Sequence, residues 1–272
     1  MIKILAFDLD DTALNSKKEL TPRTREAIIR AIDWGIIAIP CTGREIGIVP
    51  DDVLAIPGLR YIITNNGAQV YSMPERKAIY SKSIDANAAK TVLLECRRYK
   101  AFIFASIGTK NILDSEGVIW AGESAKSLAP DYIKAMRIPM ADLAGLMDRS
   151  GDPVYKYALI VLDEEELGRI KECISGLSGV YLTSSGEENL EVMPPGASKG
   201  EALKFVCSLA GVDLTDVMAV GDNYNDMEMI SEAGYSVAMG NAVEELKELA
   251  DSVTLDCDAE GLAIAIERMC FA

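Results

Sequence analysis

The sequence contains no histidine. This absence excludes a histidine triad, a histidine general base and a histidine-ligated metal within the chain. Six cysteines are present, but no two of them have the CxxC spacing of a zinc or thioredoxin-like site. Because histidine is absent, acid–base chemistry must come from Asp, Glu, Lys, Tyr or Cys. The isolated cysteines fit reduced thiols, and we expect a cytoplasmic protein.

The chain also lacks an excess of basic residues and a long apolar run. Its 272 residues include 27 Lys plus Arg against 42 Asp plus Glu, for a net charge of −15. This balance disfavours a nucleic-acid partner, whereas a small anionic substrate is compatible because a bound cation can reverse the local field. No apolar stretch reaches the roughly 18 residues of a membrane span, and Lys3 and Asp8 interrupt the first apolar run too early for a signal peptide.

Short apolar runs followed by polar turns are the main pattern of the chain. Residues 2–7, 36–41 and 61–63 are apolar runs of strand length, and each leads into a polar turn. Thr21 and Pro22 are typical of a helix start, so a helix is expected between the first two runs. The repetition predicts an α/β fold: a Rossmann-like doubly wound parallel sheet with its functional edge at the carboxyl ends of the strands.

The pattern changes in the middle of the chain. Strand-like and helix-like runs alternate there without the polar turns, which predicts an inserted α+β cap domain over residues 83–187. The core is then expected to comprise residues 1–82 and 188–272. Within the cap we expect helices over 86–98, 124–136, 139–149 and 163–176, and strands over 102–107, 154–162 and 179–184.

The predicted strand ends carry the residues suited to chemistry. They supply Asp8, Asp10, Thr42, Asp222 and Asp226, while Lys199 opens a helix. So many carboxylates need a counter-charge, and Mg²⁺ suits them because it takes oxygen ligands. Lysine and threonine suit phosphoryl oxygens. An aspartate can act as a nucleophile without an activating base, and a second carboxylate can move the proton.

Four segments in order resemble the motifs of the haloacid dehalogenase superfamily. They are Asp8-Leu9-Asp10-Asp11-Thr12, Thr42-Gly43-Arg44, Ser198-Lys199-Gly200 and Gly221-Asp222-x-x-Asn225-Asp226. The insertion between the second and third motifs resembles that of Cof-type sugar phosphatases with a class II subtype B cap. Asp11 departs from the glycine that the family often has. Asp tolerates a positive φ better than most residues, so we expect no loss of function.

The resemblance implies a role for each matching residue. Asp8 would be the nucleophile and Asp10 the general acid/base, with Thr42 and Lys199 completing the catalytic set. The phosphate- or substrate-binding residues implied are Thr42, Gly43, Arg44, Asn66, Lys199 and Asn225. The Mg²⁺ ligands implied are Asp8, Asp10 and Asp222, with Asp226 supporting the metal or orienting Lys199.

Structural alternatives exist for several of these residues. Thr42 could simply end a strand, Lys199 could be a solvated residue of a first helical turn, and Asp226 could be a helix-start carboxylate. Arg44 could contact substrate or only pair with an acid on the surface. Asn66 precedes a glycine in a common turn pair, so it could serve the turn alone or act as a hinge or substrate residue.

Three functions fit the sequence. The first is a Mg²⁺-dependent phosphatase that hydrolyses a small phosphorylated metabolite, such as a sugar phosphate, through an aspartyl-phosphate. The second is a phosphosugar mutase of the same superfamily, similar to phosphomannomutases, which needs a convergent arginine cluster on the cap for a second phosphate. The third is a phosphate-binding regulator that has lost activity. The cap cations that could set specificity are Arg97, Arg98, Lys110, Lys126, Lys134, Arg137 and Lys156.

Overall fold

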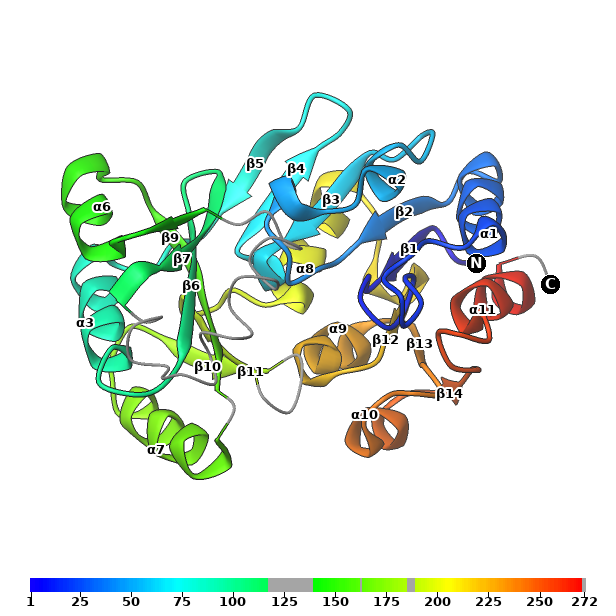
Figure 1. The fold of residues 1–272 in the computed structure, drawn as a ribbon. Coiled ribbons are helices and arrows are strands. Elements are labelled where there is room, and N and C mark those ends of the chain that lie inside the picture. Colours follow the sequence, from blue (N-terminus) through cyan, green and yellow to red (C-terminus); the bar gives the residue numbers. More distant parts are fainter. Residues whose placement is uncertain (117–138, 162, 185–188, 271–272) are drawn as a thin grey trace. The chain divides into compact units, whose positions relative to one another are not determined.

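The computed structural model describes residues 1–116, 139–161, 163–184 and 189–270 (Figure 1). The chain divides into two compact units. The first comprises Met1–Arg44, Val49–Ser81 and Ala197–Ala272, and the second comprises Glu45–Ile48 and Lys82–Gly196. No helix among the described residues is long and apolar enough to cross a membrane.

A parallel sheet forms the centre of the first unit, as the sequence predicts. Its order is β14-β13-β12-β1-β2. The strands are β1 (Ile4–Phe7), β2 (Ile37–Pro40), β12 (Val217–Gly221), β13 (Tyr235–Ala238) and β14 (Ser252–Val253). Every residue of β1 is fully buried, which explains its continuous apolar run. A parallel bridge between Cys41 and Ile63 brings β3 (Tyr61–Thr64) beside β2.

The rest of the first unit is a β-meander and a set of helices. Strand β3 continues antiparallel into β4 (Gln69–Ser72) and β5 (Lys77–Ser81). The helices are α1 (Pro22–Asp33), α2 (Asp51–Leu54), α8 (Lys199–Ala210), α9 (Met227–Glu232), α10 (Glu244–Leu249) and α11 (Gly261–Met269). Helix α1 begins as predicted, because the Thr21 side chain accepts a hydrogen bond from the backbone N–H of Thr24.

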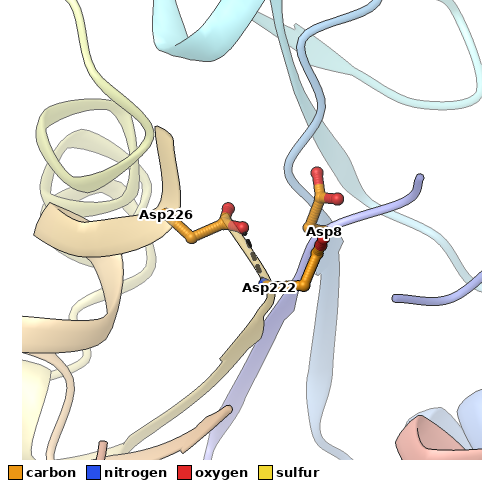
Figure 2. Close-up of side chains that lie close together, drawn as sticks. All are labelled: Asp8, Asp222 and Asp226. Carbon is orange, nitrogen blue, oxygen red and sulfur yellow. Dashed lines mark hydrogen bonds between the residues drawn. The ribbon is translucent and has the colours of Figure 1, made fainter. Parts of the chain in front are cut away.

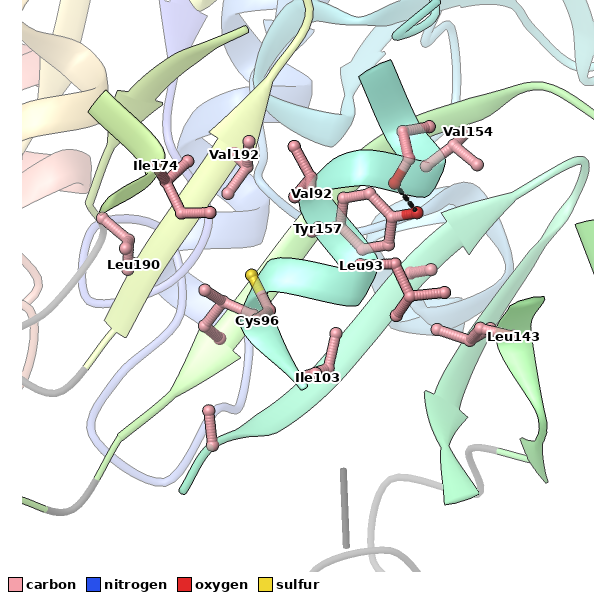
Figure 3. Close-up of a cluster of buried hydrophobic side chains, with 14 of the residues drawn as sticks. Val92, Leu93, Cys96, Ile103, Leu143, Val154, Tyr157, Ile174, Leu190 and Val192 are labelled. Atoms are coloured by element: carbon pink, nitrogen blue, oxygen red, sulfur yellow. Dashed lines mark hydrogen bonds between the residues drawn. The ribbon is translucent and has the colours of Figure 1, made fainter. Parts of the chain in front are cut away.

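The second unit is built on a six-stranded sheet with the order β10-β11-β9-β6-β7-β8. Its strands are β6 (Phe102–Ile107), β7 (Lys110–Asp114), β8 (Met140–Ala141), β9 (Val154–Ile160), β10 (Tyr181–Thr183) and β11 (Asn189–Met193). The helices among its described residues are α3 (Ala86–Cys96), α6 (Leu143–Ser150) and α7 (Glu164–Ser175). An apolar cluster joins these helices to the sheet (Figure 3). Within it the Tyr157 hydroxyl donates to the carbonyl of Ala89 at 2.9 Å, which satisfies the one polar atom of that ring.

The boundary of the insertion differs from the sequence expectation at its carboxyl end. Strand β11 pairs antiparallel with β9 and β10 and therefore lies in the second unit, whereas the sequence analysis assigned residues from 188 onward to the core. The segment Leu190–Met193, in which Glu191 stands among apolar residues, suits either sheet, and only its long-range partner strand decides between them.

Two further differences lie within the second unit, and one prediction there is not tested. Strand β7 was not predicted from the sequence. The helix expected over 139–149 is strand β8 followed by the shorter α6, because the Asp142 side chain accepts from the backbone N–H of Gly145 and starts the helix there. The helix expected over 124–136 lies outside the described residues.

Candidate active site

The site begins where three adjacent parallel strands end. Strand β1 lies between β12 and β2, and Phe7 is in register with Val220 and Pro40. The next residues along these strands lead to Asp8, Thr42 and Asp222. These residues come from distant parts of the sequence but share one sheet edge, as the strand-end pattern predicts.

Lys199 is fully buried and pairs with two carboxylates. Its Nζ lies 2.5 Å from Asp8 Oδ1 and 2.7 Å from Asp226 Oδ1. Burial alone would lower the pKa of this lysine, but the charges of Asp226 and Asp8 outweigh burial and raise it. Ser198 caps α8 by accepting from the backbone N–H of Glu201, which fixes the first turn that carries Lys199. The alternative of a solvated first-turn lysine is therefore wrong.

Asp226 uses both of its carboxylate oxygens inside the protein. Oδ1 accepts from Lys199, and Oδ2 accepts from the backbone N–H groups of Asp222 and Asn223 at 3.0 and 3.1 Å. Figure 2 shows this side chain directed at the backbone of Asp222. A Cβ at Gly221 would lie 2.7 Å from Asp226 Oδ2, so this turn requires glycine. Of the two roles considered for Asp226, the geometry favours orientation of Lys199.

Asp8 and Asp222 retain oxygen atoms that could hold a metal. Carboxylate oxygens of Asp8, Asp222 and Asp226 lie within 4.8 Å of one another (Figure 2). Among the described residues, the side chain of Asp8 is hydrogen-bonded through Oδ1 to Lys199, and that of Asp222 through Oδ1 to the Thr12 hydroxyl at 2.8 Å. The Oδ2 atoms of Asp8 and Asp222 therefore remain as candidate ligands.

The acidic cluster contains more negative than positive charge. Burial raises the pKa of Asp8 well above its usual range. Lys199 opposes this shift, while Asp226, Asp222 and Asp10 add to it. Burial and the charge of Asp226 likewise raise the pKa of Asp222 to about 7. A divalent cation would relieve this repulsion. Mg²⁺ fits the donor set because it binds one or two carboxylates and keeps several waters.

Asp10 and Arg44 form a bidentate ion pair. Arg44 Nε lies 2.8 Å from Asp10 Oδ2, and Nη2 lies 2.6 Å from Oδ1. Burial favours a higher pKa for Asp10, but the hydrogen bonds and charge of Arg44 outweigh burial and lower it. Lys18 adds a cation 3.6 Å from Asp10 and 2.7 Å from Asp11. The sequence analysis did not identify Lys18, since nothing in its neighbourhood distinguishes it from a surface lysine.

The backbone at Asp11 has a positive φ of 61°, a conformation that Asp tolerates better than most residues. Asp11 therefore adopts a left-handed conformation that glycine would adopt without strain. Its carbonyl accepts a hydrogen bond from the side chain of Asn241 at 2.8 Å, which ties the loop after β1 to the loop after β13.

Thr42 is fully buried at the end of β2. Its hydroxyl oxygen accepts from the backbone N–H of Arg44 at 3.1 Å, across the turn at Gly43. Its backbone N–H donates to the carbonyl of Ile63 at 2.9 Å and its carbonyl accepts from Asn66 at 3.0 Å. The turn is thus held against the next strand of the sheet.

The loop after β3 connects three parts of the site. Asn65, Asn66 and Gly67 all have positive φ. The backbone N–H of Asn65 donates to the carbonyl of Arg44, and the Asn66 side chain accepts from Asn225 Nδ2 at 3.1 Å. A Cβ at Gly67 would collide with the carbonyl of Ser198, so this glycine permits close packing against the start of α8. The loop therefore has more than a turn function.

The sheet, the buried lysine and the acidic cluster together define a hydrolase of the haloacid dehalogenase fold. The family model for haloacid dehalogenase-like hydrolases matches residues 5–266. The chain belongs to this family.

Individual relatives support the same assignment. The chain is 30% identical to the 5-amino-6-(5-phospho-D-ribitylamino)uracil phosphatase YwtE of Bacillus subtilis, over 98% of each chain. A solved haloacid dehalogenase-like hydrolase from B. subtilis matches with a TM-score of 0.83 and 28% identity, over 98% of this chain and 100% of that one. The subclass IIB sugar phosphatase BT4131 shares the fold, with a TM-score of 0.83 and 22% identity over 99% and 100% of the chains.

These findings confirm that the chain is an enzyme, a phosphatase of the haloacid dehalogenase superfamily and of the Cof type.

Proposed function

We propose that the protein is a Mg²⁺-dependent phosphatase that hydrolyses a small phosphorylated metabolite, a sugar or polyol phosphate, through an aspartyl-phosphate. The observation that carries the proposal is the pairing of buried Lys199 with Asp8 through one carboxylate oxygen. This pairing holds the carboxylate of Asp8 in place and leaves Oδ2 for attack on phosphorus.

The proposed reaction has two steps. In the first, Asp8 Oδ2 forms a bond to phosphorus, the ester P–O bond breaks, and the leaving oxygen takes a proton from Asp10. In the second, water attacks phosphorus, Asp10 takes its proton, and the bond to Asp8 breaks to release phosphate. Thr42 and Lys199 donate hydrogen bonds to the phosphoryl oxygens, where negative charge develops.

Mg²⁺ would neutralise charge on the phosphoryl oxygens, and we propose Asp8, Asp222 and the backbone carbonyl of Asp10 as its protein ligands. Asp226 acts through Lys199 and the Asp222 backbone, since both of its oxygens are already occupied. The cytoplasmic location expected from the cysteines remains a prediction.

Arg44 has a proposed role at the phosphate. Both Asp10 oxygens accept hydrogen bonds from Arg44. Asp10 can therefore donate a proton to the leaving group only after Arg44 has released it and bound another anion. The phosphoryl group of the substrate is such an anion, and a guanidinium binds it in the same bidentate manner. Gly43, Asn66 and Asn225 are proposed to shape the same phosphate-binding loops.

The described cap residues support hydrolysis more than mutase chemistry. A mutase needs cations that converge on a second phosphate. Arg97 is instead paired with Asp114 and Asp142, Arg98 with Glu95, and Lys156 with Glu191. Lys126, Lys134 and Arg137 lie outside the described residues. We propose that the second unit selects the substrate, and YwtE is named for a substrate whose phosphate is carried on a ribityl chain.

The test uses p-nitrophenyl phosphate with Mg²⁺ and then with a chelator. We expect Mg²⁺-dependent release of nitrophenol, and a loss of about 10⁴-fold or more in kcat for Asp8→Asn, the scale of removing a nucleophile. Asp11→Asn is the matched control, because it changes a half-buried carboxylate of the same loop and keeps a residue that tolerates positive φ. Activity without Mg²⁺, or full activity in Asp8→Asn, contradicts the mechanism.

A further inference from the structure

The turn after β13 contacts the loops that carry two of the proposed metal ligands. In this turn, Met239–Val243, the side chain of Asn241 donates from Nδ2 to the carbonyl of Asp11 at 2.8 Å. Two residues later, the backbone N–H of Val243 donates to the carbonyl of Asp222 at 3.0 Å. One short segment of the first unit is therefore bonded both to the loop after β1 and to the loop after β12. The proposed reaction gives this segment no task.

The amide of Asn241 is also held from its other side. Its Oδ1 accepts from the backbone N–H of Cys257 at 2.9 Å, so Nδ2 is the atom that faces Asp11. The turn itself is held on the loop after β14, because the backbone N–H of Gly240 donates to the carbonyl of Leu255 at 3.0 Å. Asn241 is exposed, yet both ends of its amide are bonded to backbone groups of neighbouring loops.

The bond from Asn241 holds the backbone between two groups of the site. The φ of 61° at Asp11 lies in the left-handed region, which costs free energy for a residue other than glycine. The peptide group that follows Asp11 leads to Thr12, whose hydroxyl donates to Asp222 Oδ1 at 2.8 Å. The peptide group that precedes Asp11 carries the carbonyl of Asp10, a proposed Mg²⁺ ligand. Rotation of the backbone at Asp11 would therefore displace groups of the metal site on both sides.

We propose that Asn241 is a positioning residue for the metal site. Through the carbonyl of Asp11, it fixes the directions of the Asp10 carbonyl and of the Thr12 side chain. The inference rests on the proposed function, because it assumes that the Asp10 carbonyl and Asp222 bind Mg²⁺. Mg²⁺ demands nearly ideal octahedral geometry, so its affinity depends on how well the ligands are held in place. Changing a residue that orients a ligand typically costs about 10- to 100-fold in metal affinity.

The test measures Mg²⁺ binding to the full chain without substrate, by isothermal titration calorimetry. The variant Asn241→Ala removes both hydrogen bonds of the side chain and changes no charge. We expect its Kd for Mg²⁺ to rise about tenfold, the lower end of the range for such partners, because Asn241 acts through the backbone. On p-nitrophenyl phosphate, the Mg²⁺ concentration for half-maximal rate should rise by the same factor, while kcat at saturating Mg²⁺ changes less than about threefold.

The variant Asn241→Asp separates the two hydrogen bonds. It keeps an acceptor for the backbone N–H of Cys257, so the connection to the loop after β14 is retained. At Asp11 it places an oxygen where Nδ2 donated, and two acceptors then face each other. At high ionic strength, which screens the added exposed charge, we expect the same rise of about tenfold in the Kd for Mg²⁺.

Asp251→Ala is the matched control on the same pair of strands. Asp251 is an exposed residue just before β14, and its Oδ2 accepts from the backbone N–H and the hydroxyl of Ser236 on β13 at 2.8 and 2.9 Å. These contacts join the amino ends of the two strands, whereas Asn241 lies beyond the carboxyl end of β13. The control should lower the free energy of unfolding and leave the Kd for Mg²⁺ within about twofold of wild type.

Two results would overturn the inference. One is a Kd for Mg²⁺ that stays within about twofold of wild type in either Asn241 variant. The other is an equal rise of the Kd in Asp251→Ala, which would attribute the effect to a general loss of stability. A wild type that binds no Mg²⁺ instead contradicts the proposed function itself, so the two failures are distinguishable.

Discussion

Each of the two units buries a lysine against carboxylates, but the balance of charge differs. In the first unit, the carboxylates of Asp8, Asp222 and Asp226 cluster within 4.8 Å, and Lys199 pairs with two of them. In the second unit, Lys156 on β9 lies 2.5 Å from Glu191 on β11, one cation for one anion. Within the part of the chain that the structure describes, the first arrangement sets three carboxylates against Lys199, whereas the second pairs one lysine with one glutamate.

This difference separates a site from a structural contact. Burial of an ion pair costs desolvation free energy, which the attraction between the two charges offsets only in part. A matched pair nevertheless has no net charge, so it needs no ligand to neutralise it. An excess of buried carboxylates raises the pKa values of Asp8 and Asp222. Binding of a cation among these carboxylates is therefore favourable.

The largest effect is expected on activity from Lys199→Met. The variant keeps the length of the side chain but removes the charge that balances Asp8 and the phosphate. We expect kcat on p-nitrophenyl phosphate to fall about 10³-fold, the scale of losing one donor to developing negative charge. Steady-state kinetics with saturating Mg²⁺ measure this loss.

Lys156→Met is the matched variant in the second unit. It leaves Glu191 buried without its cation, so the free energy of unfolding should fall by about 3–5 kcal/mol, while kcat on p-nitrophenyl phosphate stays near wild type. The double variant Lys156→Met with Glu191→Leu should regain most of that stability. Denaturant unfolding measures both. A loss of kcat like that of Lys199→Met would remove the distinction between the two pairs.

A smaller effect is expected from Mg²⁺ on thermal stability. At a free concentration of 100 times its Kd, a ligand that binds only the folded state stabilises it by about 2.7 kcal/mol. We therefore expect Mg²⁺ to raise the Tm of the wild type, and Asp222→Asn to show little or no rise. Glu232→Gln is the control, because its acidic cluster already contains Lys204. An equal rise in Asp222→Asn would place the metal elsewhere.

The smallest effect is expected from Asn66→Gly. Glycine keeps the left-handed backbone at this position but removes the side chain that accepts from Asn225. Loss of this hydrogen bond should lower kcat about tenfold, since one such bond contributes about 1 kcal/mol and also orients Asn225. Asn225→Ala in the Asn66→Gly background should add little further loss. Full additivity of the two changes would show that the side chains act separately.

Part of this structure could be predicted because its signals are local. The apolar run of β1 and the cap at Thr21 depend on neighbouring residues alone, and both are as expected. The edge of the parallel sheet could also be predicted, because successive strand ends carried polar residues.

Other features depend on partners that are distant in the sequence. Strand β11 has the same apolar pattern whichever sheet it joins, so its place beside β9 was not predictable. Thr12 belongs to the first motif, but its hydrogen bond to Asp222 spans 210 residues.

Residue order alone specifies which chemical groups can lie at the strand ends of the site. The contacts that each group makes depend on the tertiary structure. Asp226 is an example, because the fold places Lys199 on one of its oxygens and the backbone of Asp222 on the other. The physical reason is that residue order limits which side chains reach one sheet edge, whereas hydrogen bonds at that edge depend on positions set by the whole fold.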